Sequence, residues 1–328
     1  MPQLATAPGI MNLTELVQDP GFKWDDFSEG ARAASSVDDQ VLAIPALIDN
    51  LAIVYNKDLF QAAGVDEPTT DWTWDDFQAA AKALTDPGAQ QFGFAYPIDG
   101  SEDTVWHYDA MLWEAGGDIL NADNTEAAFN SAQGVEALTT LQQMAVTDKS
   151  VFLDQQNVGK IDELFNAGKI GMLVTGPWAL SSYPSVKYGV QIMPMYDGGS
   201  HATIAGPDMW VMFDNGEGRG DAAWEFMTWL TAAEQVTQDS MTSGHLPIRN
   251  SVVDEPGFLD AFDTKFPGEG LFAENLANVT KARPVITSYD QISQIMGEAV
   301  VKVMLGQAEP QQALDDAAAQ VNEVLAGG

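Results

Sequence analysis

Short apolar runs alternate along this chain with longer segments whose apolar residues recur on one side of a helix. Runs rich in Val, Ile, Phe and Tyr predict strands at residues 41–44, 51–55, 92–96, 170–174, 190–193 and 210–213. Residues 289–304 instead place apolar side chains at a 3.6-residue period, which predicts an amphipathic helix. The alternation of the two patterns predicts an α/β fold.

Several helix ends are marked by their own residues. Thr73 precedes a Trp-Asp-Asp sequence, so its hydroxyl is expected to cap a helix whose first turn is acidic. Asp221 is expected to cap a helix over residues 222–230 in the same way. Gly306 is typical of a helix end, and Pro310 of the first position of the next helix.

Composition narrows the class of protein. The hydrophobic fraction of 45% is that of a globular protein, and the length of 328 residues is too great for one ordinary small domain. The chain carries 48 acidic and 14 basic side chains, a net charge of −34, so nucleic acid is not expected as a partner. Because the acids are spread along the chain, we interpret them as a solvated surface suited to salty surroundings, with a cation site as the alternative. The chain has no cysteine for a disulfide or thiolate metal site.

Five sequence motifs then follow one another over about 270 residues. They read PALIDNLAIVYNKDLFQAAG at 45–64, followed by Pro68 and WTWDDF at 72–77; LWEAGGD at 112–118; FNAGKIGM at 165–172 with GPW at 176–178; AWEF at 223–226 with WLT at 229–231; and LG at 305–306 with ALD at 313–315. In this order they resemble the extracellular solute-binding proteins of ABC importers. The particular similarity is to family 1, the maltose-binding-protein-like sugar receptors.

The resemblance implies a two-lobed periplasmic-binding-protein fold of the class II-like kind, with a hinge and a ligand cleft between the lobes. The expected lobes are residues 1–46 with 197–245 and residues 50–193 with 250–328, and the expected hinge crossings are near 45–50 and 193–196. These discontinuous boundaries come from the resemblance and not from the local sequence pattern.

The start of the chain differs from that of a secreted receptor. Residues 1–5 lack the basic and apolar regions of a signal sequence. In the resembling family, the stretch similar to residues 9–14 lies well inside the first lobe. We therefore expect this chain to be N-terminally truncated, with an incomplete first lobe. The alternative is a compact variant without the first βαβ units, which would leave one face of a parallel sheet uncovered.

The resemblance also implies the function. A receptor of this family captures a mono- or oligosaccharide, closes around it and delivers it to the transmembrane subunits of an ABC permease. It would be an extracytoplasmic monomer, periplasmic or anchored to the cell surface, with no cofactor, metal site or catalytic residue. Sugar rings need flat aromatic faces and planar polar groups, and the chain supplies 9 Trp, 7 Tyr and 15 Phe.

Trp178 is the first candidate for a sugar contact. It follows Gly176-Pro177 at the end of a predicted strand, where the resemblance implies a tryptophan that stacks on the ligand. The alternative is an aromatic packed at a helix start. Further candidates, each weighed against core packing or a local hydrogen bond, are Asp49, Trp106, Tyr108, Asp208, Trp210, Arg283 and Tyr289. Four other tryptophans are expected to pack in the interior: Trp72, Trp74, Trp224 and Trp229.

Two other functions stay open at this point. A binder of a cationic or other polar solute, such as a polyamine, needs acids in the cleft, and Asp49 and Asp208 are the candidates. A carbohydrate-active enzyme needs two carboxylates about 5 to 10 Å apart in the cleft. The three histidines, His107, His201 and His245, lack the spacing of a metal motif.

Overall fold

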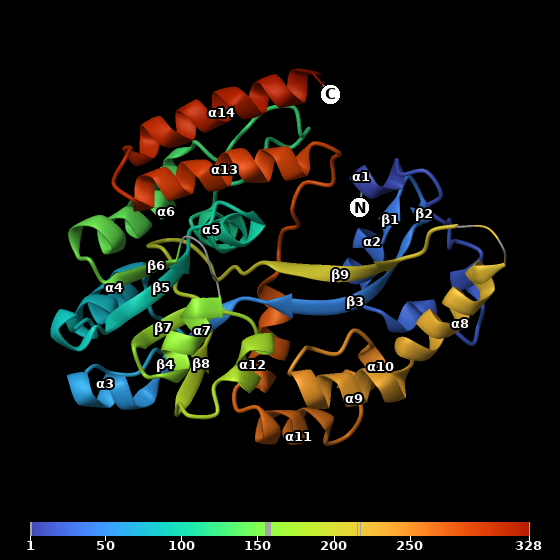
Figure 1. The fold of residues 1–328 in the computed structure, drawn as a ribbon, viewed down its shortest axis with the longest axis horizontal. Helices are drawn as coiled ribbons and strands as arrows, with labels where there is room; N and C mark the ends of the chain where they lie inside the picture. Colours follow the sequence, from blue (N-terminus) through green and yellow to red (C-terminus); the bar gives the residue numbers. More distant parts are fainter. Residues whose placement is uncertain (1, 155–158, 215, 217, 328) are drawn as a thin grey trace. The chain divides into compact units, whose positions relative to one another are not determined.

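The chain folds into two compact units. The computed structural model describes residues 2–154, 159–214, 216 and 218–327. Unit 1 comprises residues 1–49, 205–273 and 285–287, and unit 2 comprises residues 50–204, 274–284 and 288–328. Both units mix strands and helices (Figure 1). The predicted α/β class is confirmed.

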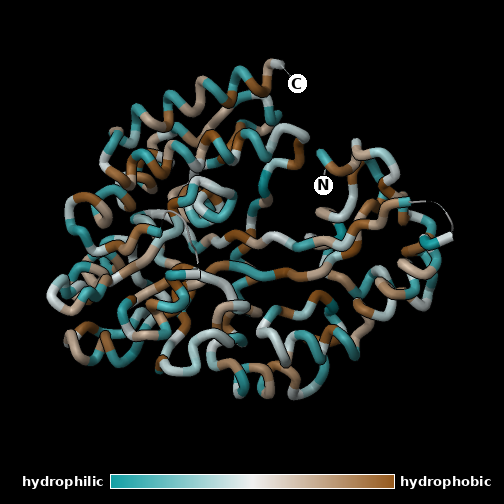
Figure 2. Tube along the Cα trace, viewed as in Figure 1, coloured by the Kyte–Doolittle hydropathy of each residue, from teal (hydrophilic) through white to brown (hydrophobic). Residues whose placement is uncertain are grey.

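Unit 2 is built on a five-stranded sheet with the order β6-β5-β7-β4-β8. Its strands are β4 (Ala52–Asn56), β5 (Phe92–Pro97), β6 (Val151–Asp154), β7 (Ile170–Thr175) and β8 (Tyr188–Gln191). Strand β5 runs parallel to β6 and β7, whereas β4 is antiparallel to β7 and β8. Every residue of β4 is buried. A central strand covered on both faces is a continuous apolar run, which is why the sequence pattern predicted it (Figure 2).

Helices cover the sheet of unit 2. They are α3 (Lys57–Ala63), α4 (Trp74–Ala83), α5 (Glu102–Glu114), α6 (Ala132–Gln142), α7 (Gly159–Asn166), α13 (Tyr289–Met304) and α14 (Pro310–Gly327), with shorter turns η3 (Pro87–Ala89), η4 (Gln143–Thr147), η5 (Pro177–Ser182) and η6 (Leu276–Asn278). Helix α13 packs against both α5 and α14 (Figure 1). Its contact with the loop before α5 is close, because a Cβ on Gly297 would lie 2.4 Å from the carbonyl oxygen of Gly100.

The local end signals are largely reproduced. Thr73 and Asp76 form a reciprocal capping box at the start of α4. Helices α13 and α14 begin at the predicted Tyr289 and Pro310. The prediction for Asp221 is wrong, because α8 begins at Arg219 and Asp221 lies within its first turn.

Unit 1 contains the two-stranded sheet of β3 (Ala43–Asn50) and β9 (Ala205–Val211) and the hairpin of β1 (Ser36–Val37) and β2 (Gln40–Val41). Its helices are α1 (Pro2–Ala5), α2 (Glu29–Ala34), α8 (Arg219–Leu230), α9 (Ala233–Ser243), α10 (Asn250–Val253), α11 (Phe258–Lys265) and most of α12 (Glu269–Asn275), with turns η1 (Leu16–Gln18) and η2 (Trp24–Asp26). Strands were predicted at 41–44 and 210–213. Pairing extends β3 to residue 50 and starts β9 at residue 205, in an Ala-Gly-Pro segment without an apolar pattern.

Arg249 explains why residues 250–273 pack in unit 1 and not in the second lobe, where the sequence analysis assigned them. Its side chain is 4% exposed and donates to the carbonyl oxygens of Phe22 at 3.1 Å and Lys23 at 3.2 Å, and to that of Thr231. Its guanidinium also lies 4.2 Å from the ring centroid of Phe27. These bonds hold the start of α10 against residues 22–27, a pairing that no local pattern signals.

Residues 197–204 belong to unit 2 and not to the first lobe expected for them. The hydroxyl of Thr203 donates to the carbonyl oxygen of Leu51 at 2.7 Å and accepts from its N–H at 3.2 Å. This side chain therefore attaches the segment to the start of β4. The first change of unit falls between Asp49 and Asn50, inside the segment expected to cross.

The tryptophans expected to pack divide into two groups. Trp74 is 2% exposed, and the ring centroid of Trp224 lies 4.7 Å from that of Phe22. Trp229 is instead 56% exposed and stacks on Phe226, so its predicted burial is wrong.

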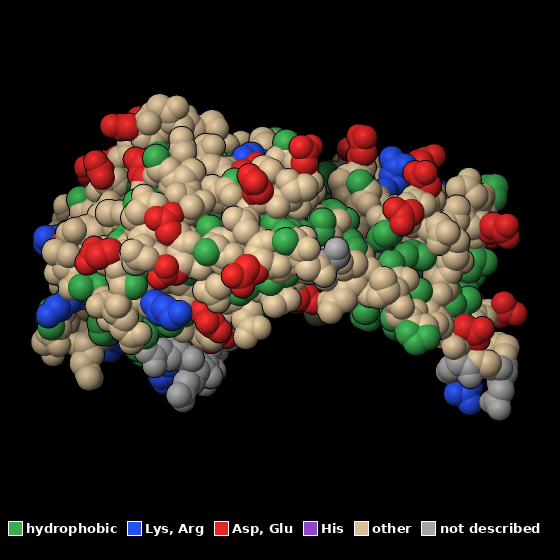
Figure 3. All heavy atoms as spheres, turned by 90° about the horizontal axis from the view of Figure 1, so that it is seen from above, with side chains coloured by type: hydrophobic (Ala, Val, Ile, Leu, Met, Phe, Trp, Pro, Cys, Tyr) green, Lys and Arg blue, Asp and Glu red, His purple; other side chains and the backbone are tan. Residues whose placement is uncertain are grey.

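Acidic side chains are scattered over the visible faces of both units, as expected for a dispersed acidic surface (Figure 3).

Candidate functional site

Unit 2 contains a cavity of about 310 Å³ at one edge of its sheet. The parallel strands β5 and β7 both end there, so the residues that follow them meet at the same edge. The N-terminal parts of α5, α7 and η5 contribute the other walls. The lining residues are Ala95, Pro97, Asp103, His107, Gly159, Ile161, Asp162, Leu173, Val174, Thr175 and Trp178.

Two of the predicted aromatic residues come together beside this cavity. The ring centroids of Trp106 and Trp178 are 5.8 Å apart, with an interplanar angle of 33°. Both side chains are partly exposed, and Trp178 lines the cavity. The indole Nε1 of Trp106 is buried and has no hydrogen-bond partner in the part of the chain that the structure describes. The pair offers apolar faces of the kind that cover the C–H side of a sugar ring.

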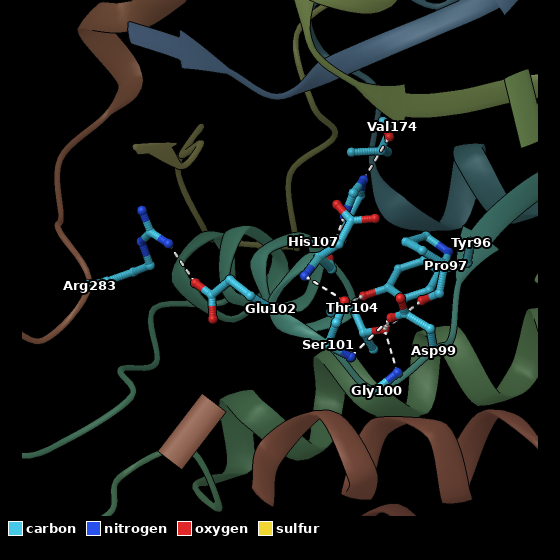
Figure 4. A network of polar contacts seen from close by, with 11 residues as sticks. Tyr96, Pro97, Asp99, Gly100, Ser101, Glu102, Thr104, His107, Val174 and Arg283 are labelled. Carbon is cyan, nitrogen blue, oxygen red and sulfur yellow. Dashed lines mark hydrogen bonds and ion pairs between the residues drawn. The ribbon is translucent and has the colours of Figure 1, made fainter. Parts of the chain in front are cut away.

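His107 fastens α5 to the end of β7. Its Nδ1 lies 2.7 Å from the carbonyl oxygen of Asp103, and its Nε2 lies 2.9 Å from that of Val174 (Figure 4). Both ring nitrogens therefore face backbone carbonyls, which leaves no lone pair directed at a metal ion. No group of three or more metal-ligating side chains occurs among the described residues.

Asp103 and Asp162 give the cavity its charge. The carboxylate of Asp162, on α7, accepts a hydrogen bond from the hydroxyl of Tyr183. Burial raises the pKa of Asp162, and the nearby charge of Asp103 raises it further, despite the opposing effect of the Tyr183 hydrogen bond. Burial likewise raises the pKa of Tyr183. Among the described residues, no Lys or Arg lines the cavity, so these walls present carboxylate acceptors and repel anions.

Tyr108 does not reach this cavity. It is 0% exposed, and its hydroxyl donates to the carbonyl oxygen of Gly134 at 2.9 Å. Two residues along a helix correspond to a rotation of about 200°, so Tyr108 points away from the side that carries Trp106. Its ring has no surface to offer a solute, which corrects its selection as a contact residue.

Arg283 and Tyr289 meet each other through Glu102 and do not line the cavity. The Nη1 of Arg283 lies 2.5 Å from Oε1 of Glu102, and the Tyr289 hydroxyl donates to the same oxygen at 3.1 Å. Glu102 is the first residue of α5, immediately before Asp103. Both predicted residues are thus attached to the helix that supplies one wall of the cavity.

The remaining predicted residues belong to unit 1. Asp49 is 6% exposed; one of its carboxylate oxygens accepts from the N–H of Leu246 at 3.0 Å, and the other lies 2.5 Å from Nδ1 of His245. The hydrogen bond to Asp49 raises the pKa of His245. Asp208 and Trp210 are exposed on β9. Asp49 therefore already has hydrogen-bond partners within unit 1, whereas Asp208 and Trp210 are accessible to solvent.

Sequence reasoning missed Asp103, Asp162 and Glu102, and considered His107 only as a metal ligand. Helical spacing was an available signal for Asp103, because it lies three positions before Trp106 and four before His107, so the three residues share one side of a helix. Asp162 had no comparable signal, since it reaches the cavity from a different helix.

Comparison with known proteins adds a family to this geometry. A model of the family described as "Bacterial extracellular solute-binding protein" matches residues 1–237. The chain belongs to this family. Membership confirms the predicted resemblance and the expected extracytoplasmic location. The structure describes no helix with the length and hydropathy needed to cross a membrane.

Members of known structure share the fold over nearly the whole chain. A cyclic α-maltosyl-1,6-maltose-binding protein from Arthrobacter globiformis is 29% identical, with a TM-score of 0.82 over 100% of this chain and 82% of that chain. An ABC substrate-binding protein from Listeria monocytogenes, in complex with cycloalternan, is 27% identical, with a TM-score of 0.88 over 99% and 82%. The sn-glycerol-3-phosphate-binding periplasmic protein UgpB of Brucella melitensis is 24% identical over 98% of this chain and 77% of its own length. The predicted two-lobed periplasmic-binding-protein fold is confirmed.

Proposed function

We propose that this solute-binding protein captures a neutral mono- or oligosaccharide for an ABC importer. The observation that carries the proposal is the Trp106–Trp178 pair beside an acidic cavity, whose described lining residues include no Lys or Arg. Aromatic faces suit the apolar side of a pyranose, and carboxylates accept hydrogen bonds from its hydroxyl groups. The ligands named for the Arthrobacter and Listeria proteins are oligosaccharides, which supports this class.

The charge of the cavity separates this ligand from a phosphorylated one. The Brucella relative is named for sn-glycerol 3-phosphate, a dianion at neutral pH. A phosphate needs Arg, Lys or backbone N–H donors, and the two carboxylates of this cavity would repel it. We therefore favour a neutral sugar over a sugar phosphate or polyol phosphate.

A polyamine is less well supported. Of the two acids proposed for it, Asp49 already accepts hydrogen bonds from His245 and Leu246, and neither it nor Asp208 lines the cavity of unit 2. The acids that do line the cavity, Asp103 and Asp162, suit a cation as well as a sugar hydroxyl, so the preference rests on the ligands named for the relatives. The relatives compared above are named for sugars and a glycerol phosphate. These observations favour the sugar.

We also infer that the protein has no catalytic activity and works as a monomer with the transmembrane subunits of a permease. Its matched relatives are binding proteins. Incubation with chromogenic α- and β-glycosides is expected to release no product. Turnover of either glycoside would contradict this inference.

The proposed contacts are Trp106, Trp178, Asp103 and Asp162 from unit 2, with Asp208 and Trp210 as candidates from unit 1. Isothermal titration with glucose, maltose, cyclic glucans and sn-glycerol 3-phosphate tests the ligand class. A sugar is expected to bind, and Trp178→Ala should weaken its binding on the order of tenfold, which is about 1.4 kcal/mol.

Trp229→Ala is the matched control, because Trp229 is exposed on α8 of unit 1. It should leave the affinity unchanged. Binding of the phosphate alone, or equal affinities for the wild type and Trp178→Ala, would contradict the proposal.

A further inference from the structure

Glu102 joins three residues that are far from it in the sequence. Its Oε1 accepts hydrogen bonds from Arg283 Nη1 at 2.5 Å and from the Tyr289 hydroxyl at 3.1 Å. Its Oε2 accepts from the hydroxyl of Ser293. Figure 4 shows Glu102 directed toward Arg283, while His107 on the same helix is directed toward Val174. One carboxylate thus connects α5 with the coil before α13 and with α13 itself.

The partners of Glu102 flank a place where the chain changes unit. The coil leaves unit 2 after Pro284, contributes residues 285–287 to unit 1 and returns at Ser288. Arg283 lies two residues before this excursion, and Tyr289 lies two residues after it. Glu102 therefore holds both flanks of the excursion from within unit 2.

The same carboxylate belongs to the helical turn that carries the proposed solute contacts. Asp103 follows Glu102 directly, and Trp106 lies one turn further along α5. The loop entering α5 packs closely against α13, because a Cβ on Gly297 would lie 2.4 Å from the carbonyl oxygen of Gly100. A displacement of this first turn would consequently disturb the hydrogen bonds to Arg283, Tyr289 and Ser293.

The ion pair between Arg283 and Glu102 is partly shielded from solvent. The side chains of Arg283 and Glu102 are 31% and 40% exposed, so solvent screens the pair only in part. Burial alone would lower the pKa of Arg283, but the charge of Glu102 and its neighbours raises it. Asp109 is close by but fully buried, and burial raises the pKa of its carboxyl group. Glu102 is thus the carboxylate that pairs directly with Arg283.

We propose that Glu102 is a positioning residue for solute binding, which couples the first turn of α5, with Asp103 and Trp106, to the excursion of residues 285–287. The proposal rests on the proposed sugar site. It adds the residue that connects the solute contacts on α5 with the segment where the chain passes from unit 2 into unit 1 and back. Removing the carboxylate leaves the walls of the cavity present but no longer fixed relative to this coil. The affinity for the sugar should then fall, while the midpoint of thermal unfolding changes little.

The test compares Glu102→Gln with Asp118→Asn. Glutamine keeps the shape and one acceptor but loses the charge. Asp118 is the matched control, because its carboxylate accepts from Lys281 Nζ at 2.9 Å on the same coil and lies outside α5. For each variant, the Kd of the sugar, the midpoint of thermal unfolding and amide hydrogen exchange in peptides 99–109 and 281–292 are measured, with and without the sugar.

The expected result is that Glu102→Gln weakens sugar binding on the order of tenfold and speeds exchange in both peptides, with a change in the unfolding midpoint similar to that of Asp118→Asn. Asp118→Asn should speed exchange only in peptide 281–292. Equal effects of the two variants on Kd, or an unchanged peptide 99–109 in Glu102→Gln, would overturn the proposal. If the wild type binds no sugar, the proposed function fails, and the exchange of the sugar-free proteins alone decides whether Glu102 couples the two segments.

Discussion

The indole of Trp178 folds back over Gly176. A Cβ at Gly176 would lie 1.7 Å from Cζ3 of this ring and 2.2 Å from Cη2, so only a glycine leaves room for it. The backbone of Gly176 is extended, with φ −107° and ψ 177°, which any residue can adopt. The glycine is thus required by the neighbouring ring and not by its own backbone conformation.

Gly176→Ala should therefore displace Trp178 without straining the backbone. We expect sugar affinity to fall on the order of tenfold, close to the effect of Trp178→Ala, because both changes remove the same aromatic face. Titration calorimetry gives the affinities. Gly30→Ala is the control, since a Cβ there meets no atom within 4 Å. Unchanged affinity in Gly176→Ala would show that the position of this ring does not matter.

Glu269 should make the free energy of unfolding depend on pH. It is 0% exposed, and neither of its carboxylate oxygens has a hydrogen-bond partner among the described residues. Burial, followed by the charges of Asp49 and Asp263, raises its pKa from 4.5 to about 9. Folding therefore favours the protonated carboxyl group. Its contribution to the free energy of unfolding is complete below pH 4.5 and decreases as the pH rises toward 9, by at most about 1.4 kcal/mol per pH unit.

Glu269→Gln mimics the protonated form and should raise the free energy of unfolding at pH 7. Denaturant titrations between pH 4 and 9 measure the free energy of unfolding of the variant and of the wild type. The difference between the two cancels the effect of the net charge that both share. The difference should grow with pH. A constant difference across this range would show that Glu269 does not titrate as the burial implies.

The hydrogen bond between His245 and Asp49 should stabilise unit 1 with the same sign of pH dependence. The raised pKa of His245 comes first from this bond, so the contribution is complete below the unfolded value of 6.5 and is lost as pH rises through the folded value. Asp49→Asn should remove about 1–2 kcal/mol at pH 5.5 and less at pH 8.5. Denaturant unfolding at the two pH values measures the losses, and NMR titration of the His245 ring gives its pKa; equal losses at both values would refute the assignment.

Arg249→Lys should destabilise unit 1 strongly. Lysine cannot reproduce the fork of donors that reaches Phe22, Lys23 and Thr231, so several buried carbonyl groups would lose partners. We expect a loss of about 3 kcal/mol or more in the free energy of unfolding. Arg32→Lys is the control, because Arg32 pairs with Asp25, whose side chain is 93% exposed, and should change stability by less than about 1 kcal/mol.

Elements with local causes could be predicted from neighbouring residues. Asn56 caps α3 through the N–H groups of Asp58 and Leu59, and Gly64 ends the same helix with φ +66°. The strand before it and the period of α13 were also readable from neighbouring residues. Each depends on groups within about one helical turn, or on burial over a continuous run. The family motifs then predicted the two-lobed fold and selected Trp178 as a candidate ligand contact.

Contacts between distant residues depend on how the chain packs in three dimensions. This packing joined Glu102 to Arg283 and Tyr289, buried Tyr108 and exposed Trp229. Composition and periodicity could not decide these outcomes, because each depends on the surface that a different segment presents. A helix pattern tells which side chains share a face, and packing against the rest of the chain determines whether that face meets core, cavity or solvent.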